Sequence, residues 1–455
     1  MKIPLPPPAF GEAVLKLTQS QLNDLEVGAL AGGRYLHWDE LRHRAPPAGL
    51  THETWWAKLK LARHALLRPL PLYDKRKRPI LFATPDPVLH QLHRIDQRAA
   101  GSVGMETPVV SGDDRNRYLV NSLIEEAITS SQLEGAATTR REARAMLRSG
   151  RRPRDPSERM ILNNYHAMET IRDLREYELT PERVMHLHRV VVDGTLDDPG
   201  AEGRLRKAGE PIQVVDAARA TVLHDPPPAA SLPKRLQRLG AFANAPTDGR
   251  LFVHPVIRAV LLHFMLGYDH PFVDGNGRTA RALFYWSMAR SGYWLMEYVS
   301  ISRLLRRAPA KYIRAYLHTE TDANDATYFI VHQLEIIERA IEELHRYLEH
   351  KAAEQRGVEA LLRHAPRLSG CLNHRQIALL GHALRHTGYA YTVESHRRSH
   401  RVTPQTARVD LQNLVHLKLL EQTKRSRAFR FYAPDDLRER IAGAAGLDGE
   451  DERCG

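Results

Sequence analysis

The stretch of the sequence best suited to chemistry is HPFVDGNGRTAR, residues 270–281, which lies between two segments of helical spacing. Gly275 and Gly277 allow the backbone to turn so that several N–H groups face one point. The start of the following helix adds its partial positive charge there. Arg278 and Arg281 are three residues apart and are therefore neighbours on the first helical turn. Two guanidinium groups beside such a backbone nest suit a polyphosphate.

Two further side chains of this stretch could act on a bound phosphate. Asp274 offers hard oxygen ligands, and Mg²⁺ commonly binds one or two carboxylates together with substrate phosphates. His270 can serve as a general base because the ordinary pKa of imidazole lies near operating pH. A base, a metal ligand and donors for phosphate charge together predict phosphoryl or nucleotidyl transfer. The bland alternatives are a structural histidine at a helix end and a plain N-cap aspartate.

The same stretch resembles the Fic family motif, H-x-F-x-[DE]-G-N-G-R-x-x-R. Every defining position of the motif is met, by His270, Phe272, Asp274, Gly275, Asn276, Gly277, Arg278 and Arg281. The resemblance implies a protein adenylyltransferase, which transfers AMP from ATP to a Ser, Thr or Tyr hydroxyl of a target protein. The absence of G-x-x-x-x-G-K-[ST] shows that the stretch is not a P-loop.

The resemblance also implies a role for each residue of the motif. His270 would deprotonate the target hydroxyl, and Asp274 would hold Mg²⁺. The phosphates of ATP would be bound by Gly275, Asn276, Gly277, Arg278 and Arg281, the last at the γ-phosphate. In the related Doc branch, whose members are kinases, lysine replaces the second glycine, so Gly277 favours AMP transfer over phosphate transfer.

A second string, SSQLEG at residues 130–135, resembles the family's inhibitory motif, [ST]-x-x-x-E-[GN]. Ser130 and Glu134 share one helix face at i, i+4, and Gly135 can end the helix. The resemblance implies that Glu134 pairs with Arg281 and displaces the γ-phosphate, so that the enzyme is autoinhibited. Spacing alone leaves an ordinary surface glutamate as the alternative. In some family members the glutamate also supports removal of AMP from the target.

The expected fold class is mainly α: a Fic-type helical core with a β-hairpin flap, followed by a C-terminal winged helix-turn-helix. The hairpin is predicted from short β-branched runs between residues 212 and 224. An extended segment of the target protein would dock on the exposed edge of this hairpin, at Ile212, Val214 and Val222. The alternative is a structural flap that only covers the core.

The C-terminal region is basic and reads as three helices and a hairpin. Thr403, Gln405, Thr406 and Arg408 would start the second helix of the helix-turn-helix, where base edges are contacted. Lys424 and Arg425 would form a wing tip for DNA phosphates. The alternative is a module for dimerisation or protein contact. Its predicted core is Val409, Leu411, Leu414, Val415, Leu417 and Leu420.

The length of 455 residues predicts two to four domains. We divide the chain into a helical N-terminal extension (1–114), a Fic catalytic core with its inhibitory helix (115–350), a linker (351–372), a winged-helix domain (373–434) and a flexible tail (435–455). A competing interpretation of the whole chain is a DNA-binding transcriptional regulator whose Fic domain senses nucleotide.

The overall composition limits the classes of partner that the chain could bind. Lys and Arg total 66 against 54 Asp and Glu, a net charge of +12 that suits nucleic acid or a polyphosphate, or only confers solubility. Two cysteines, Cys371 and Cys454, exclude a disulfide framework and a cysteine-rich zinc module. The chain starts without the apolar core of a signal peptide and has no long apolar span. We expect a cytoplasmic protein that binds ATP, a target protein and DNA, but no membrane. It could also modify itself or form a homodimer.

Overall fold

The computed structural model describes most of the chain, and it divides into two compact units, Met1–Leu344 and His345–Gly455. None of the helices in the described part is long and apolar enough to span a membrane. The described residues are 3–23, 27–100, 112–210, 212–216, 220–249, 251–363, 372–386, 388–400, 402–425 and 428–443.

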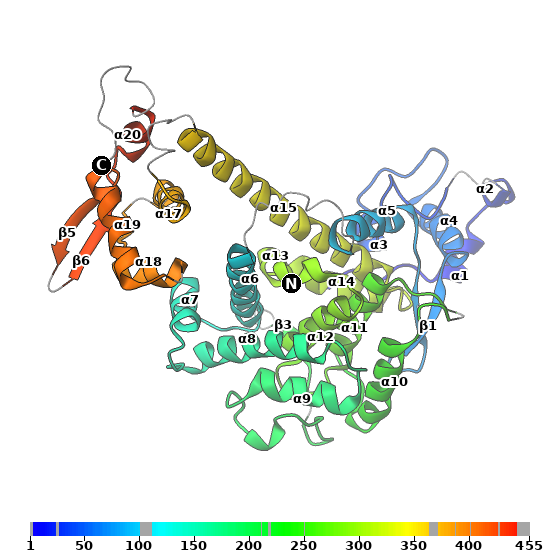
Figure 1. Ribbon diagram of the computed structural model, residues 1–455. Helices are drawn as coiled ribbons and strands as arrows, with labels where there is room; N and C mark the ends of the chain where they lie inside the picture. The colour runs from blue at the N-terminus through cyan, green and yellow to red at the C-terminus, as the bar shows by residue number, and fades with distance from the viewer. Residues whose placement is uncertain are drawn as a thin grey trace. The chain divides into compact units, whose positions relative to one another are not determined.

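The first unit begins with short helices and a two-stranded antiparallel hairpin (Figure 1). The hairpin was not expected in the predicted helical extension, because prolines at 69 and 71 argue against a strand. It forms because alternate residues are buried and because the second strand continues its hydrogen bonds onto residues 324–326. The elements are α1 (Phe10–Leu15), α2 (Gln19–Asn23), α3 (Trp38–Leu41), α4 (His52–His64), β1 (Arg68–Tyr73), β2 (Pro79–Phe82), α5 (Asp86–Ile95) and the π-helical turn η1 (Asp96–Ala100).

The rest of this unit is helical and surrounds α11, which is apolar on all sides and buried along nearly its whole length. Helix α12 packs against α11, α8, α9 and α6. The helices are α6 (Gly112–Leu133), α7 (Arg140–Ser149), α8 (Pro156–Leu174), α9 (Pro181–Val192), α10 (Leu232–Asn244), α11 (Pro255–Asp269), α12 (Asn276–Arg290), α13 (Ile301–Arg307), α14 (Pro309–Thr321) and the part of α15 (Thr327–Arg363) up to Leu344, with 3-10 turns η2 (Pro199–Ala201), η3 (Ala229–Ser231) and η4 (Trp294–Tyr298).

The predicted hairpin flap is present as two short antiparallel strands, β3 (Val214–Asp216) and β4 (Thr221–His224). Its turn, residues 217–219, lies outside the described residues. Ile212 precedes β3 rather than belonging to it. Val222 points to solvent with 42% of its surface exposed, whereas Val214 is half-buried. The mainly α fold with one flap hairpin is therefore confirmed for this unit.

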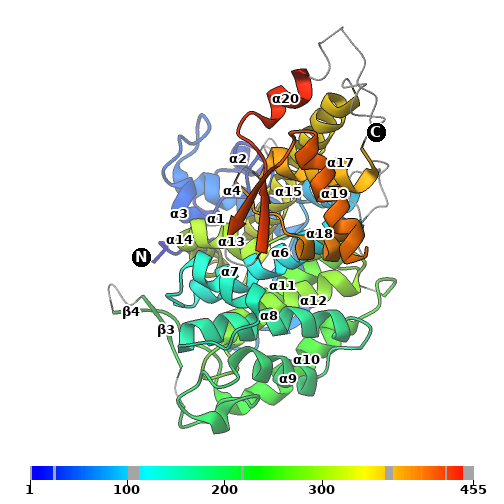
Figure 2. The ribbon, with the colours of Figure 1, turned by 60° about the vertical axis from the view of Figure 1, so that its left-hand side comes forward.

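In its described residues, the second unit contains the end of α15, three further helices, a two-stranded antiparallel hairpin and a last short helix (Figure 2). This element order agrees with the predicted winged helix-turn-helix, and that assignment stays a prediction. Leu411, Leu414 and Leu420 are buried as expected, but Val409 is 54% exposed, so its placement in the core was wrong. The elements are α17 (His374–Arg385), α18 (Val393–His400), α19 (Pro404–His416), β5 (Glu421–Arg425), β6 (Ala428–Tyr432) and α20 (Leu437–Gly443).

Two predicted boundaries are wrong. The linker 351–372 is helical over its first part, because α15 continues to Arg363 through good helix formers such as Ala, Glu and Leu. The flexible tail 435–455 begins with α20. Leu437 and Ile441 are four residues apart on one face of that helix and are both buried in the core of the second unit.

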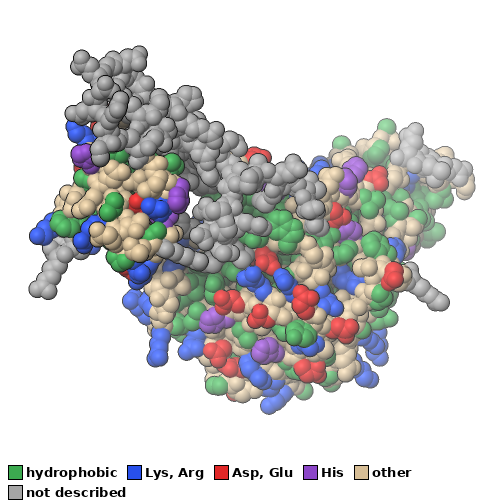
Figure 3. Space-filling model, viewed as in Figure 1, with side chains coloured by type: hydrophobic (Ala, Val, Ile, Leu, Met, Phe, Trp, Pro, Cys, Tyr) green, Lys and Arg blue, Asp and Glu red, His purple; other side chains and the backbone are tan. Residues whose placement is uncertain are grey.

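Basic and acidic side chains are interspersed around α8, α9 and α10 on the face shown in Figure 3. Around these three helices, neither sign of charge forms a continuous patch on this face.

Candidate active site

The predicted catalytic loop connects α11 to α12, and both of its ends adopt left-handed backbone geometry. His270 ends α11 with φ of +40°, and Gly275 caps α12 with φ of +77°. A Cβ at Gly275 would lie 2.5 Å from Val192 Cγ1, so only glycine fits there. The loop therefore delivers its backbone to the N-terminus of α12, where the first N–H groups have no intrahelical partner.

Contacts that involve neither Arg278 nor Arg281 hold the loop in place. Asn276 Oδ1 accepts from the Phe272 N–H at 3.0 Å, and its Nδ2 donates to the Phe272 carbonyl at 2.9 Å. Phe272 stacks on His188 of α9 at 3.7 Å between ring centres. Since the side-chain amide of Asn276 is engaged in the loop, its predicted phosphate contact would fall to its backbone N–H.

His188 is a functional residue that sequence reasoning missed. Its Nε2 donates to the Asp274 carbonyl at 2.9 Å, and its Nδ1 accepts from the Gly203 N–H at 3.1 Å, which fixes the neutral tautomer. Burial lowers its pKa to about 4. Nothing in the sequence distinguishes it from a core histidine, because its partners are distant in the chain.

His270 has the geometry of a general base. Its Nδ1 lies 2.5 Å from the Gly267 carbonyl, which can only accept, so the proton is on Nδ1 and the lone pair is on Nε2. Burial lowers the pKa of the imidazole and keeps it neutral. Its own carbonyl accepts from Arg206 Nε at 2.8 Å, and Arg206 was also absent from the sequence predictions.

Arg278 is buried behind the loop. Its Nη1 donates to the Val191 carbonyl at 3.0 Å, and its Nη2 donates to Asp274 Oδ2 at 3.2 Å. Burial lowers the pKa of the guanidinium. The Asp274 side chain itself is 57% exposed, so its second oxygen is available to a ligand. Arg278 orients Asp274; its predicted contact with phosphates stays a prediction.

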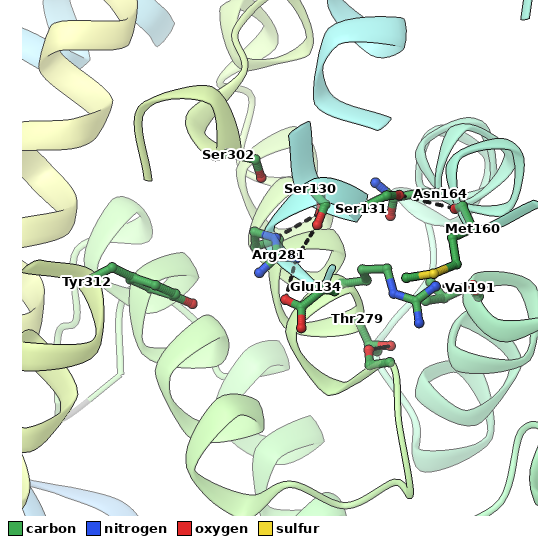
Figure 4. A network of polar contacts seen from close by, with 12 residues as sticks. Ser130, Ser131, Glu134, Met160, Asn164, Val191, Thr279, Arg281, Ser302 and Tyr312 are labelled. Carbon is green, nitrogen blue, oxygen red and sulfur yellow. Dashed lines mark hydrogen bonds and ion pairs between the residues drawn. The ribbon is translucent and has the colours of Figure 1, made fainter. Parts of the chain in front are cut away.

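Arg281 is held by the end of α6 (Figure 4). Its Nε donates to Ser130 Oγ at 2.8 Å, and its Nη2 donates both to the Ser130 carbonyl at 3.0 Å and to Glu134 Oε1 at 2.8 Å. Burial opposes the charge of Arg281, but Glu134, Tyr312 and Glu126 together outweigh it, and the pKa of the guanidinium is raised. The predicted contact between Glu134 and Arg281 is therefore present.

Glu134 also covers the backbone nest. A Cβ added at Gly277 would fall 2.1 Å from Glu134 Oε1, so the carboxylate lies directly against the loop glycine. Helix α6 ends as predicted: Gly135 has φ of +96°, and the Ala136 N–H donates back to the Ser131 carbonyl at 3.0 Å. The helix is anchored by Glu126, whose buried carboxylate accepts from hydroxyl and backbone N–H groups of α12 and α13, among them Tyr285, Ser300 and Ser302.

His270, Gly277, Arg281 and Glu134 border one cavity of about 250 Å³. It is lined by His270, Arg281 and Glu134, by Val214 of the flap, and by aromatic side chains of α14 that include Tyr312. Of the three predicted flap residues, Val214 reaches this cavity, while Ile212 and Val222 are not among its lining residues. The cavity thus brings together the His270 imidazole, the Arg281 guanidinium and Gly277 at the N-terminus of α12, whereas Arg278 and Asp274 are not among its lining residues.

The predicted DNA-contact residues lie in the second unit. Thr403 caps α19 by accepting from the Thr406 N–H at 3.1 Å, and Gln405 and Arg408 are exposed on that helix. Lys424 is exposed on β5, and the side chain of Arg425 lies outside the described residues. DNA binding by this surface stays a prediction.

Comparison with known proteins now places the loop in a family. Residues 178–288 match the model of the Fic/DOC family, a range that contains His188 and the whole stretch 270–281. This stretch, about a quarter of the chain, therefore resembles a Fic/DOC domain. Glu134 lies before the matched range.

Related proteins are similar over part of the chain. The protein adenylyltransferase Fic of Drosophila grimshawi is 34% identical over 120 residues, 26% of this chain and 22% of that protein; the protein of the same name from Drosophila melanogaster gives the same values. The chain thus spans about a fifth of the length of these relatives. Among solved structures, a Fic family protein from Desulfovibrio desulfuricans G20 is 20% identical with a TM-score of 0.47, covering 76% of this chain and 94% of that chain. Fic-1 from C. elegans is 22% identical with a TM-score of 0.46, covering 58% and 73%.

Proposed function

We propose that this chain is an autoinhibited protein adenylyltransferase, which transfers AMP from ATP to a Ser, Thr or Tyr hydroxyl of a target protein and releases pyrophosphate. The observation that carries the proposal is the free lone pair on His270 Nε2 in a cavity shared with Arg281 and the N-terminus of α12. The Drosophila relatives named as protein adenylyltransferases support the same reaction class.

In this reaction the hydroxyl oxygen of the target attacks the α-phosphorus of ATP. Its proton passes to His270 Nε2, and the bond from the α-phosphorus to the oxygen bridging it to the β-phosphorus breaks, so that pyrophosphate leaves. The N–H groups at the start of α12 stabilise the charge that develops on the α-phosphate. Nη2 of Arg281 would bind the γ-phosphate once Glu134 has withdrawn.

Asp274 would hold Mg²⁺. When bound, Mg²⁺ would neutralise phosphate charge. The residues fit such an ion because the Asp274 carboxylate is half-exposed at the edge of the nest. Among the described residues no group of three or more His, Cys, Asp or Glu could hold a metal without further ligands. The remaining ligands would therefore be phosphate oxygens and water, which is the usual arrangement for Mg²⁺ at nucleotide sites.

The contacts of Arg281 support the proposed autoinhibition. Its guanidinium is committed to Ser130 and Glu134 by three hydrogen bonds, and the Glu134 carboxylate lies against Gly277 where phosphate oxygens would approach. ATP can occupy the productive position only when this carboxylate is displaced. The retained Gly277, where the Doc branch has lysine, favours AMP transfer over phosphate transfer.

Two parallel incubations test the reaction type. The full-length Glu134→Gly variant is mixed with ATP labelled at the α-phosphate, or with ATP labelled at the γ-phosphate, and the protein is assayed for label. We expect α-label to enter protein and γ-label to leave as pyrophosphate. Entry of γ-label alone would identify a kinase, and entry of neither label, with ATP still bound, would favour the alternative.

That alternative is a DNA-binding regulator whose Fic domain senses nucleotide. The exposed Gln405 and Arg408 beside the N-cap of α19 favour it. DNA binding by the full chain would weaken steeply with added salt, and Lys424→Ala would weaken binding to all sequences alike.

A further inference from the structure

A second cavity lies in the first unit, with a volume of about 440 Å³, within the range typical of small-molecule sites. It is bordered by residues 33–36 and Glu40, by α5, and by one face each of α14 and α15. No residue lines both this cavity and the active-site cavity.

The two cavities use opposite faces of α14. Tyr312, Tyr316 and Glu320 line the active-site cavity, whereas Lys311, Arg314 and His318 line the second one. At 100° per residue these two sets lie about half a helical turn apart. The second cavity is therefore a separate site.

Three cationic side chains line the second cavity without an ion-pair partner. Arg34, Lys311 and Arg314 form no ion pair with any other described residue. A fourth, Arg94, is neutralised by Glu338 of α15. Three unpaired cations in one hollow are suited to an oxyanion.

Two buried polar atoms in this wall also lack a partner. Arg314 Nε and His318 Nε2 are buried and form no hydrogen bond in the described part of the chain. His318 is only 6% exposed, and its ring stacks on His37 at 4.2 Å. Burial, with Arg314 nearby, lowers its pKa to about 4, so the imidazole is neutral. Because buried polar groups are nearly always bonded, these atoms point to a missing partner.

Two acidic side chains, Glu40 and Glu335, also line the cavity. Burial raises the pKa of Glu335, and Arg34 and Lys311 act against that rise. Three unpaired cations outnumber the two carboxylates, so the cavity remains net positive at neutral pH. The carboxylates can accept hydrogen bonds from hydroxyl or amine groups of the same ligand.

We propose that this cavity binds a small organic anion, whose phosphate or carboxylate group contacts Lys311 and Arg314 and whose hydroxyl or amine groups face Glu40 and Glu335. Inorganic phosphate and citrate serve as the probes, titrated into the full chain against chloride of equal ionic strength. Binding is followed by calorimetry and by the shift in Tm. A response to phosphate identifies a phosphate site, and a response to citrate alone identifies a carboxylate site.

Lys311→Gln and Arg314→Gln should each weaken the binding at least tenfold. Lys311 is exposed, so its variant keeps the fold even where Arg314→Gln does not. The matched control is Arg306→Gln, which removes an exposed arginine of α13 outside the cavity and should change nothing. Arg281→Ala, in the active site, should also leave the binding intact. The proposal is overturned if neither anion exceeds chloride, or if Arg281→Ala removes the response while Lys311→Gln keeps it.

Discussion

Two arginines in the first two turns of α12 are both buried, yet they are held by different parts of the molecule. Arg278 bonds to the Val191 carbonyl and to Asp274 of its own loop. Arg281 bonds to Ser130 and Glu134, which approach from the end of α6. The contacts of Arg278 complete the loop, whereas those of Arg281 occupy the place that we propose for phosphate. The site therefore has a fixed half, the loop with Arg278, and an exchangeable half, Arg281 with Ser130 and Glu134.

The largest effect is expected from breaking the fixed half at His270. In the Glu134→Gly background, His270→Ala should lower AMP transfer by about 10²–10⁴, the usual loss of general-base catalysis. ATP binding should persist, because the imidazole is not a principal phosphate ligand. Initial rates with α-labelled ATP measure the first quantity and calorimetry the second. Transfer within threefold of the parent would remove His270 from the role of base.

Acid should loosen the fixed half through His188. Its folded pKa of about 4 lies below its ordinary value, so the unfolded chain binds the proton first. The stability contributed by the neutral His188 side chain is complete above pH 6.5. It is lost as the pH falls toward 4, by roughly 1.4 kcal/mol per pKa unit. His188→Phe keeps a ring against Phe272 but cannot titrate. Unfolding at several pH values should give a shallower slope for the variant; equal slopes would refute this role.

Arg278→Ala should destabilise the first unit by about 2 kcal/mol, because it leaves the Val191 carbonyl unpaired in a buried place. The loss of stability should be the same with and without Glu134, because no hydrogen-bond partner of Arg278 belongs to the exchangeable half. Denaturant unfolding of the single variant and of its combination with Glu134→Gly measures both values. A difference beyond about 1 kcal/mol would show that the halves are coupled.

The exchangeable half should behave as one unit. Arg281→Ala removes the partner of Glu134 and the proposed γ-phosphate ligand together, so transfer should fall at least tenfold below that of Glu134→Gly. Adding Glu134→Gly to Arg281→Ala should bring no gain, which is the non-additive result expected of residues that act together. A double variant as fast as Glu134→Gly alone would separate Arg281 from the phosphate.

The sequence predicts the parts of the site that depend on local spacing. Local spacing sets the geometry of three groups. These are the two loop glycines, the histidine four residues before an aspartate, and the serine and glutamate at i, i+4. The positioning residues His188 and Arg206 could not be predicted in this way. They act on the loop from elements that are distant in the chain, and a buried histidine on a helix has the same appearance in sequence whether or not it fixes a loop.

The mainly α fold could be predicted from helical periodicity, but its boundaries could not. The β1–β2 hairpin depends on a tertiary pairing with residues 324–326 that no local pattern records. The continuation of α15 through the expected linker and the burial of α20 in the expected tail depend on helix propensity and on two apolar contacts. Such weak local signals are decided by packing.

The central claim is that Glu134 blocks the site by holding Arg281. Automodification of the full chain with α-labelled ATP, compared across four proteins, tests it most directly. Glu134→Gly should exceed wild type by tenfold or more, about 1.4 kcal/mol of relieved competition. Glu134→Gln, which keeps helix propensity but removes the charge, should activate at least in part. Glu125→Gln removes an ion-paired carboxylate of the same helix, bonded to Arg140 and Arg144, and should leave the rate unchanged. Two Glu134 variants no faster than wild type would contradict the account.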